Sequence, residues 1–162
     1  MRGDENPDES GQHQLQDTID RQRWIGLLAR ASSARIAELV DQLDEIPSHE
    51  RLRGPEAGLV MVRGRASGSG APFNLGEMSL TRCSVRIASG RIGHGYVQGR
   101  DNSHAETAAL LDAMLQEPEL HDRVMAGVIE DLARVERDAH HETASKAAAT
   151  RVNFFTMTRG ED

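Results

Sequence analysis

The segment Gly93–His104 combines residue types and a spacing that could bind a charged group. Its composition is that of a strand, a glycine-containing turn and the start of a helix. A helix start presents unpaired backbone N–H groups and the positive end of the helix dipole, which together suit an anion. Arg100 and His104 could add charge and hydrogen bonds. The candidates for contact with a substrate or a partner are therefore Gln98, Gly99, Arg100, Asp101, Ser103 and His104.

The same segment also permits a purely structural interpretation. Its glycines could shape a bulged strand and a turn, while Asp101 or Ser103 caps the helix that follows. Ser103 and Glu106 have the spacing of a capping box, which predicts a helix start at Ser103. The glycine spacing, GxGxxxG, matches neither the dinucleotide-binding fingerprint nor the lysine-containing phosphate loop. Both interpretations stay open on the sequence alone.

No other group of residues forms a recognisable catalytic or metal-binding pattern. A metal site needs three or four convergent ligands, and Cys83, His94 and His104 would converge only in one particular strand register. His140 and His141 are adjacent on a predicted helix, so they point about 100° apart and are expected to be solvated. Cys83 alternates with apolar positions, which indicates a small buried hydrophobe rather than a nucleophile. We therefore assign neither a catalytic residue nor a metal ligand.

Hydrophobic periodicity predicts the helices that surround this segment. Stripes at helical spacing run over residues 17–31 and 36–43, with two serines between them. After the turn, a third stripe extends over residues 103–117 and stops at a proline, and a fourth extends over residues 120–149. The sequence thus predicts helices at both ends of the chain.

The middle of the chain is predicted to form strands. Leu59–Val62 is a short apolar run, and Met78–Ala88 alternates as a half-buried strand does. Ser89 and Gly90 then provide a tight turn into Arg91–Gln98, which predicts an antiparallel hairpin. We therefore expect an α+β fold with N-terminal helices, a central antiparallel hairpin or small sheet, and C-terminal helices.

The composition limits the function classes. The chain has 26 acidic and 19 basic residues, which gives a net charge of -7. This charge disfavours nucleic-acid binding, because such binding needs clustered Lys and Arg. No apolar run approaches the roughly 20 residues of a membrane span. Residues 1–16 are acidic and almost free of apolar groups, and are expected to be a disordered tail before a domain over residues 17–162. We expect a soluble, cytoplasmic protein that binds neither nucleic acid nor a membrane.

The C-terminal end is unusually apolar for a chain terminus. Phe154, Phe155 and Met157 lie within the last nine residues. A chain end normally frays, so this apolar area is expected to dock, either on the protein's own core or on a partner.

Several of these segments together resemble the PhnG family, the small subunit of the bacterial carbon–phosphorus lyase core complex. The similarity covers roughly residues 20–117 and 148–161, and residues 17–162 would form a single PhnG-like domain. The motifs that carry it are Gly58-Leu59-Val60, Ser79–Arg86, Gly93–Asp101 with His104-Ala105-Glu106, and Arg151–Gly160.

The resemblance implies a role in the catabolism of organic phosphonates. The complex would transfer the ribose triphosphate moiety of ATP to methylphosphonate and release adenine. Expected partners are the other core subunits: a larger nucleosidase-type synthase subunit, a second small synthase subunit and a radical lyase subunit. ATP would be a substrate of the complex, this subunit would hold no cofactor, and the iron–sulfur cluster and S-adenosylmethionine would belong to a companion subunit only. This chain would be a non-catalytic, supporting subunit whose helices intertwine with its partners.

Two other functions remain compatible with the residues. A self-sufficient nucleotide-binding phosphotransfer enzyme would use the helix start at Ser103. A pure scaffold would touch no substrate and would act through its docking surfaces alone.

Overall fold

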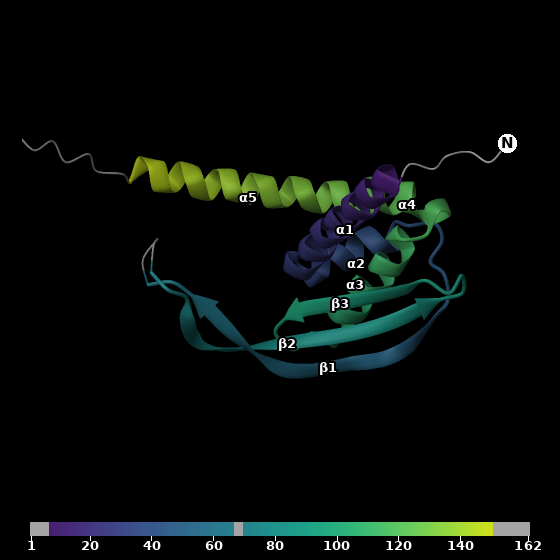
Figure 1. The fold of residues 1–162 in the computed structure, drawn as a ribbon, viewed down its shortest axis with the longest axis horizontal. Helices are drawn as coiled ribbons and strands as arrows, with labels where there is room; N and C mark the ends of the chain where they lie inside the picture. Colours follow the sequence, from purple (N-terminus) through teal and green to yellow (C-terminus); the bar gives the residue numbers. More distant parts are fainter. Residues whose placement is uncertain (1–6, 67–69, 151–162) are drawn as a thin grey trace, which may run out of the picture.

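The computed structural model describes residues 7–66 and 70–150, in which an antiparallel sheet has helices over one face (Figure 1). The sheet has three strands in chain order: β1 (His49–Gly64), β2 (Phe73–Ile87) and β3 (Ile92–Gln98). The predicted hairpin of β2 and β3 is present, with Cys83 opposite Gly95. The prediction of a small central antiparallel sheet is thus confirmed.

Helices precede and follow the sheet, which confirms the predicted α+β class. They are α1 (Pro7–Arg30) and α2 (Ser33–Asp41) before the sheet, and α3 (Asn102–Leu115), α4 (Pro118–Val124) and α5 (Glu130–Ala149) after it. A single π-helical turn, η1 (Met125–Ile129), joins α4 to α5. The helical stripe predicted over residues 120–149 therefore ends where α5 ends.

The core lies between the sheet and the helices. On β2, Thr81, Cys83, Val85 and Ile87 are buried, whereas the residues between them are partly or fully exposed. This is the alternation predicted from the sequence, because successive side chains of a strand point to opposite faces. Cys83 is 1% exposed, and burial raises the pKa of its thiol, so it is a core residue as predicted.

The backbone of β3 packs directly against the backbone of α3. A Cβ atom on Gly93 would lie 1.9 Å from the carbonyl oxygen of Ala109, and one on Gly95 would lie 2.0 Å from that of Ala105. Glycine is required at both positions because any side chain would overlap the helix backbone. The helix side of the contact is small as well, since it consists of fully buried alanines.

The helix α1 begins at Pro7, whereas the apolar pattern predicts a helix only from Asp17 and disorder before it. Proline suits the first turn of a helix. Side-chain bonds across one turn add support without burial, for example the hydroxyl of Thr18 donating to the carbonyl oxygen of Gln14 at 2.8 Å. The pattern missed residues 7–16 because they contain almost no apolar side chains. Residues 1–6 of the predicted tail lie outside the described residues.

The strand β1 is much longer than the predicted run Leu59–Val62. Its first half contains charged residues and Pro55, which do not indicate a strand. Proline is tolerated there because β1 is an edge strand and the register is irregular between Arg53 and Glu56.

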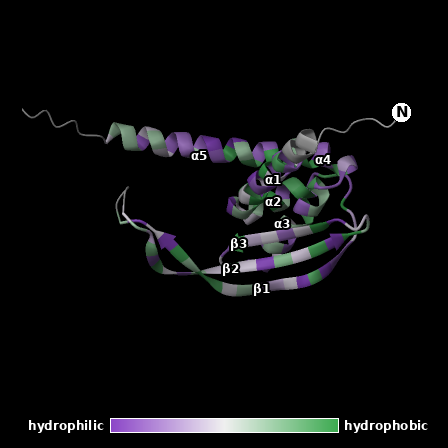
Figure 2. Ribbon diagram, in the orientation of Figure 1, coloured by the Kyte–Doolittle hydropathy of each residue, from purple (hydrophilic) through white to green (hydrophobic). Residues whose placement is uncertain are grey.

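The hairpin of β1 and β2 continues beyond the end of β3, because β3 pairs only with Leu80–Arg86 of β2. We call this projection the arm, and define it as Leu59–Gly64 together with Phe73–Met78. Figure 1 shows that the arm and α5 extend toward the same side of the molecule. Figure 2 shows that hydrophobic residues continue along the arm, away from the helices.

The close contact of β3 with α3 predicts a large effect of a single methyl group. Replacing Gly95→Ala should lower the free energy of unfolding by at least about 3 kcal/mol, because backbone atoms must move to admit the Cβ. Urea denaturation followed by circular dichroism measures this loss. Gly58→Ala is the matched control, since a Cβ there meets no atom within 4 Å. Equal stability of the two variants would contradict the predicted contact.

Candidate functional site

The turn between β3 and α3 carries the residues that the sequence singled out. Gly99 adopts φ +90°, a conformation that favours glycine. Its backbone N–H donates to the carbonyl oxygen of Ser79 at 2.9 Å, and its carbonyl oxygen accepts from the hydroxyl of Thr81 at 2.8 Å. Gly99 therefore ties the turn to β2 rather than leaving a loop open for a ligand.

The N-cap of α3 is Asp101, and the predicted capping box does not form. A carboxylate oxygen of Asp101 accepts from the backbone N–H of His104 at 2.9 Å, and this bond lowers the pKa of the carboxyl, with the Ser33 hydroxyl as a second cause. Glu106 turns instead to Arg51 on β1, at 2.7 Å. The reason is charge: two N–H groups of a guanidinium bind a carboxylate more strongly than one backbone amide.

The six candidates of this segment do not share one accessible site. His104 is 7% exposed and its ring Nε2 lies 2.7 Å from the carbonyl oxygen of Leu28, so it joins α3 to α1. Gln98, Arg100 and Ser103 are exposed. The carboxylate of Asp101 lies at the helix start, the position an incoming anion would take, which disfavours a phosphate site there.

A buried carboxylate that sequence reasoning missed lies in the middle of α3. Asp112 is fully buried, and its two oxygens accept hydrogen bonds from Arg21 at 2.8 and 3.1 Å. The indole N–H of Trp24 donates to it at 2.9 Å, as does the backbone N–H of His94. Because these donors already occupy both oxygens, the carboxylate binds α1, α3 and β3 together and is not free to act as a base.

The sequence does contain a signal for this residue. Asp112 follows Leu110 and Leu111 and precedes Ala113 and Met114, so it is a single charge inside an apolar run. Such a charge is almost never fully buried unless it is paired. Its partners could not be identified because Arg21 and Trp24 are about 90 positions away in the chain.

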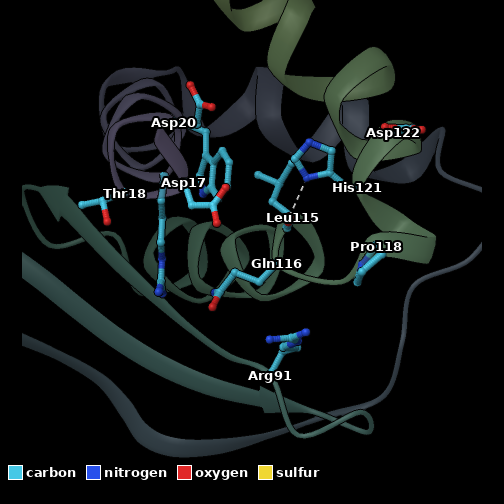
Figure 3. Close-up of a pocket in the computed structure, with 11 residues that line it drawn as sticks. Asp17, Thr18, Asp20, Arg91, Leu115, Gln116, Pro118, His121 and Asp122 are labelled. Carbon is cyan, nitrogen blue, oxygen red and sulfur yellow. Dashed lines mark hydrogen bonds between the residues drawn. The ribbon is translucent and has the colours of Figure 1, made fainter. Parts of the chain in front are cut away.

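Beside this carboxylate is a pocket of about 690 Å³ between α1, the end of α3 and α4 (Figure 3). The ring of His121 lines it and is held by a 2.6 Å contact of Nδ1 with the carbonyl oxygen of Leu115. Its charged lining is mixed: Asp17, Asp20, Arg21, Arg91 and Asp122. With both signs present and Arg21 already paired to Asp112, the pocket has no preference for an anion.

The face of the sheet opposite the helices is polar. Arg82 donates to Glu56 at 2.7 Å and Arg86 lies 3.0 Å from Glu50, so much of its charge is paired. Closer to β3 is a shallow hollow of about 700 Å³ whose lining residues include arginines but no carboxylate. Its lining includes Arg53, Arg91, His94 and Tyr96. The arginines of this hollow are paired with carboxylates that lie beside it: Arg21 with Asp112, Arg53 with Glu56 and Arg91 with Glu117.

Residues 7–66 and 70–150 contain neither a metal-binding cluster nor a membrane-spanning helix. No group of three or more His, Cys, Asp or Glu residues is placed there to hold a metal ion. None of the helices in this part combines the length and hydropathy that crossing a membrane requires. Phe154, Phe155 and Met157, the predicted docking residues, lie outside the described residues.

Fold and site together define a small α+β protein that holds a buried carboxylate between three elements and projects an apolar arm. Residues 19–160 match the family model described as "Phosphonate metabolism protein PhnG", and the chain belongs to this family. It is 43% identical over 142 residues to the protein named alpha-D-ribose 1-methylphosphonate 5-triphosphate synthase subunit PhnG of Rhizobium meliloti (strain 1021). That similarity covers 88% of this chain and 90% of the relative. The resemblance inferred from the motifs is thereby confirmed.

The N-cap assignment predicts different costs for two neighbouring substitutions. Asp101→Ala should lower the free energy of unfolding by about 1 kcal/mol, because it removes the acceptor of the His104 amide. Ser103→Ala should change it by less than about 0.5 kcal/mol, because Ser103 is exposed and is not the cap. Thermal unfolding at neutral pH measures both.

The variant Asp101→Asn separates the contribution of the capping hydrogen bond to stability from that of the carboxylate charge. Asparagine caps equally well, so stability at neutral pH should be retained. Because the pKa of Asp101 is lowered in the folded state, its charge contributes stability above the ordinary carboxyl pKa, and this is lost as the pH falls through the lowered value. Asp101→Asn should therefore show a weaker loss of stability in acid. An unchanged acid profile, or a larger cost at Ser103, would refute the assignment.

The buried carboxylate predicts a large loss on neutralisation. Asp112→Asn should lower the free energy of unfolding by about 3 kcal/mol or more, because an amide offers donors to a site filled with donors. Glu136→Gln is the control, since Glu136 pairs with an Arg30 that is 62% exposed, and should cost less than about 1 kcal/mol. Urea denaturation of both variants tests this, and similar costs would argue against a structural role of Asp112.

Proposed function

We propose that this chain is a supporting subunit of an alpha-D-ribose 1-methylphosphonate 5-triphosphate synthase. The observation that carries the proposal is the 43% identity, over nearly the whole length of both chains, to a relative named as a subunit of that enzyme. The complex would act in the cytoplasm on organic phosphonates. It would transfer the ribose triphosphate moiety of ATP to methylphosphonate and release adenine.

In this proposal the chemistry is carried out by a companion chain. The buried or half-buried titratable residues of α3 are already engaged: Asp112 by donors of α1 and β3, His104 by the carbonyl of Leu28, and Glu106 by Arg51. A nucleosidase reaction needs groups that are free to stabilise the breaking bond between ribose and base. The larger synthase subunit would provide these groups, and this chain would position or enclose them.

The partners would be the remaining core subunits: the larger nucleosidase-type subunit, the second small synthase subunit and the radical lyase subunit. The last of these would hold the iron–sulfur cluster and S-adenosylmethionine, because a chain with the single cysteine Cys83 lacks the thiolates that a cluster needs. ATP and methylphosphonate would be substrates of the assembly.

Two surfaces are suited to contact partner subunits. One consists of the exposed residues Gln98, Arg100 and Ser103, from the end of β3 to the first turn of α3, where no ion pair with Arg100 occurs among the described residues. The other is the arginine-lined hollow on the open sheet face, beside Arg53 and Arg91. Arginine suits contacts with a partner subunit because its planar guanidinium group binds a carboxylate with two hydrogen bonds.

The proposal as a whole is tested by reconstitution. Co-expression with the products of neighbouring genes should yield a stable complex that releases adenine from ATP when methylphosphonate is present. The chain purified alone should release none. Adenine release by the lone chain would overturn the supporting role and favour the self-sufficient enzyme, as would tight ATP binding measured by calorimetry.

The contribution of the turn is tested inside that complex. Arg100→Ala should lower the rate of adenine release, or the yield of the complex, by about tenfold, as expected for the loss of one charge-assisted hydrogen bond. Arg137→Ala is the control, because it removes the same charge from an exposed position on α5. An Arg100→Ala complex with unaltered yield and rate would favour the pure scaffold.

A further inference from the structure

The arm leaves an unusual amount of apolar surface uncovered. Large apolar side chains are normally exposed singly, and a group of them marks a surface that another segment covers. The exposed fractions on the arm are 63% for Leu59, 37% for Val60, 50% for Met61, 45% for Phe73 and 60% for Leu75.

The exposed side chains lie on both faces of the arm. Leu59 is opposite Ser79 and therefore shares the face of the buried Thr81, whereas Val60 is opposite Met78 and lies on the other face. A flat surface packed against one face would leave the other in water. A strand added at the edge would instead place side chains on both faces at once.

The arm also has a free edge that could accept such a strand. In the described part of the chain, β3 pairs with β2 only from Leu80 onward, and Gly99 donates its amide to Ser79 where the chain turns away. Phe73–Met78 therefore presents backbone N–H and C=O groups on that edge without a neighbouring strand among residues 7–66 and 70–150. An unpaired edge of this kind is a template for strand addition.

The chain itself contains a segment of matching length and pattern. Val152–Met157 has six residues, as has Phe73–Met78. In a strand its apolar residues would lie on both faces, with Val152 and Phe154 on one face and Phe155 and Met157 on the other. Valine and phenylalanine favour strands. A strand that is apolar on both faces thus meets an arm that is apolar on both faces.

The position of α5 makes this segment available to the arm. The helix ends at Ala149, and Figure 1 shows that this end lies on the side toward which the arm projects. The residues that follow, 151–162, number 12 and can extend about 40 Å at most. Thr150 and Arg151 separate Ala149 from Val152, so the added strand would begin within about 11 Å of the end of the helix.

We propose that Val152–Met157 adds as a strand to the free edge of β2 along Phe73–Met78 of the same chain, and so places apolar side chains beside those of β2 on both faces of the arm. The sheet would then continue beyond the end of β3 with a strand drawn from the C-terminus. This proposal does not depend on the proposed function, because it concerns the chain by itself.

Hydrogen exchange of the purified full chain, read by mass spectrometry, tests the proposal. Backbone amides of Phe73–Met78 should exchange at least about tenfold more slowly in the full chain than in a chain that ends at Thr150. Amides of Leu80–Arg86, which pair with β3 in both chains, serve as the internal control for folding. Equal exchange along Phe73–Met78 in the two chains would overturn the proposal.

Point variants identify the residues and the source of the strand. Phe154→Ser with Phe155→Ser should remove the protection, whereas the matched pair Thr158→Ala with Arg159→Ala should retain it.

Sedimentation under the same conditions should show a monomer. Protection that appears only in a dimer would assign the strand to a second copy, and protection that appears only with the other synthase subunits would assign it to a partner; either result overturns the proposal. Adenine release by the complex is measured separately, so its loss would bear on the proposed function alone.

Discussion

A buried carboxylate joins the three parts of this molecule. Asp112 belongs to α3, yet its oxygens accept hydrogen bonds from two side chains of α1 and from the backbone of β3. Because an unpaired charge in a protein interior is strongly destabilising, each of these donors must be in place when the core forms. The relative positions of α1, α3 and β3 therefore depend on one another, and with them the position of the turn that carries Arg100.

The rest of the architecture leaves surfaces for other chains. The helices cover one face of the sheet, while the other face is polar and carries the arginine-lined hollow. The arm and the outer half of α5 project away from the core. The charged residues buried in the core bind the protein's own elements, whereas exposed arginines such as Arg100 remain for contacts. This division is what a supporting subunit of an enzyme complex requires.

The sequence was informative where burial produces a period. The alternation along β2 and the helical stripe of α2 were predicted because one face of each element is buried, and the turn at Gly90 was predicted from its residue types. The stripe of α5 was predicted as well, although Leu132 is the one residue of that helix that is buried. The first half of β1 and the start of α1 were not, because they are stabilised by backbone pairing and exposed side chains. At the site, the helix start was located and Asp101 was one of its two candidate caps. The capping box predicted for Ser103 and Glu106 does not form, since Arg51 binds Glu106 across a fold that spacing cannot show.

The contact between β3 and α3 has a consequence for how this family can vary. Where side chains separate two elements, a change in one can be compensated by a change of volume in the other. At Gly93 and Gly95 the neighbours are main-chain oxygens of α3, which no substitution can shrink. A substitution of either glycine therefore cannot be compensated by a second mutation in α3. Divergent relatives should keep both glycines even where the surrounding core has been exchanged.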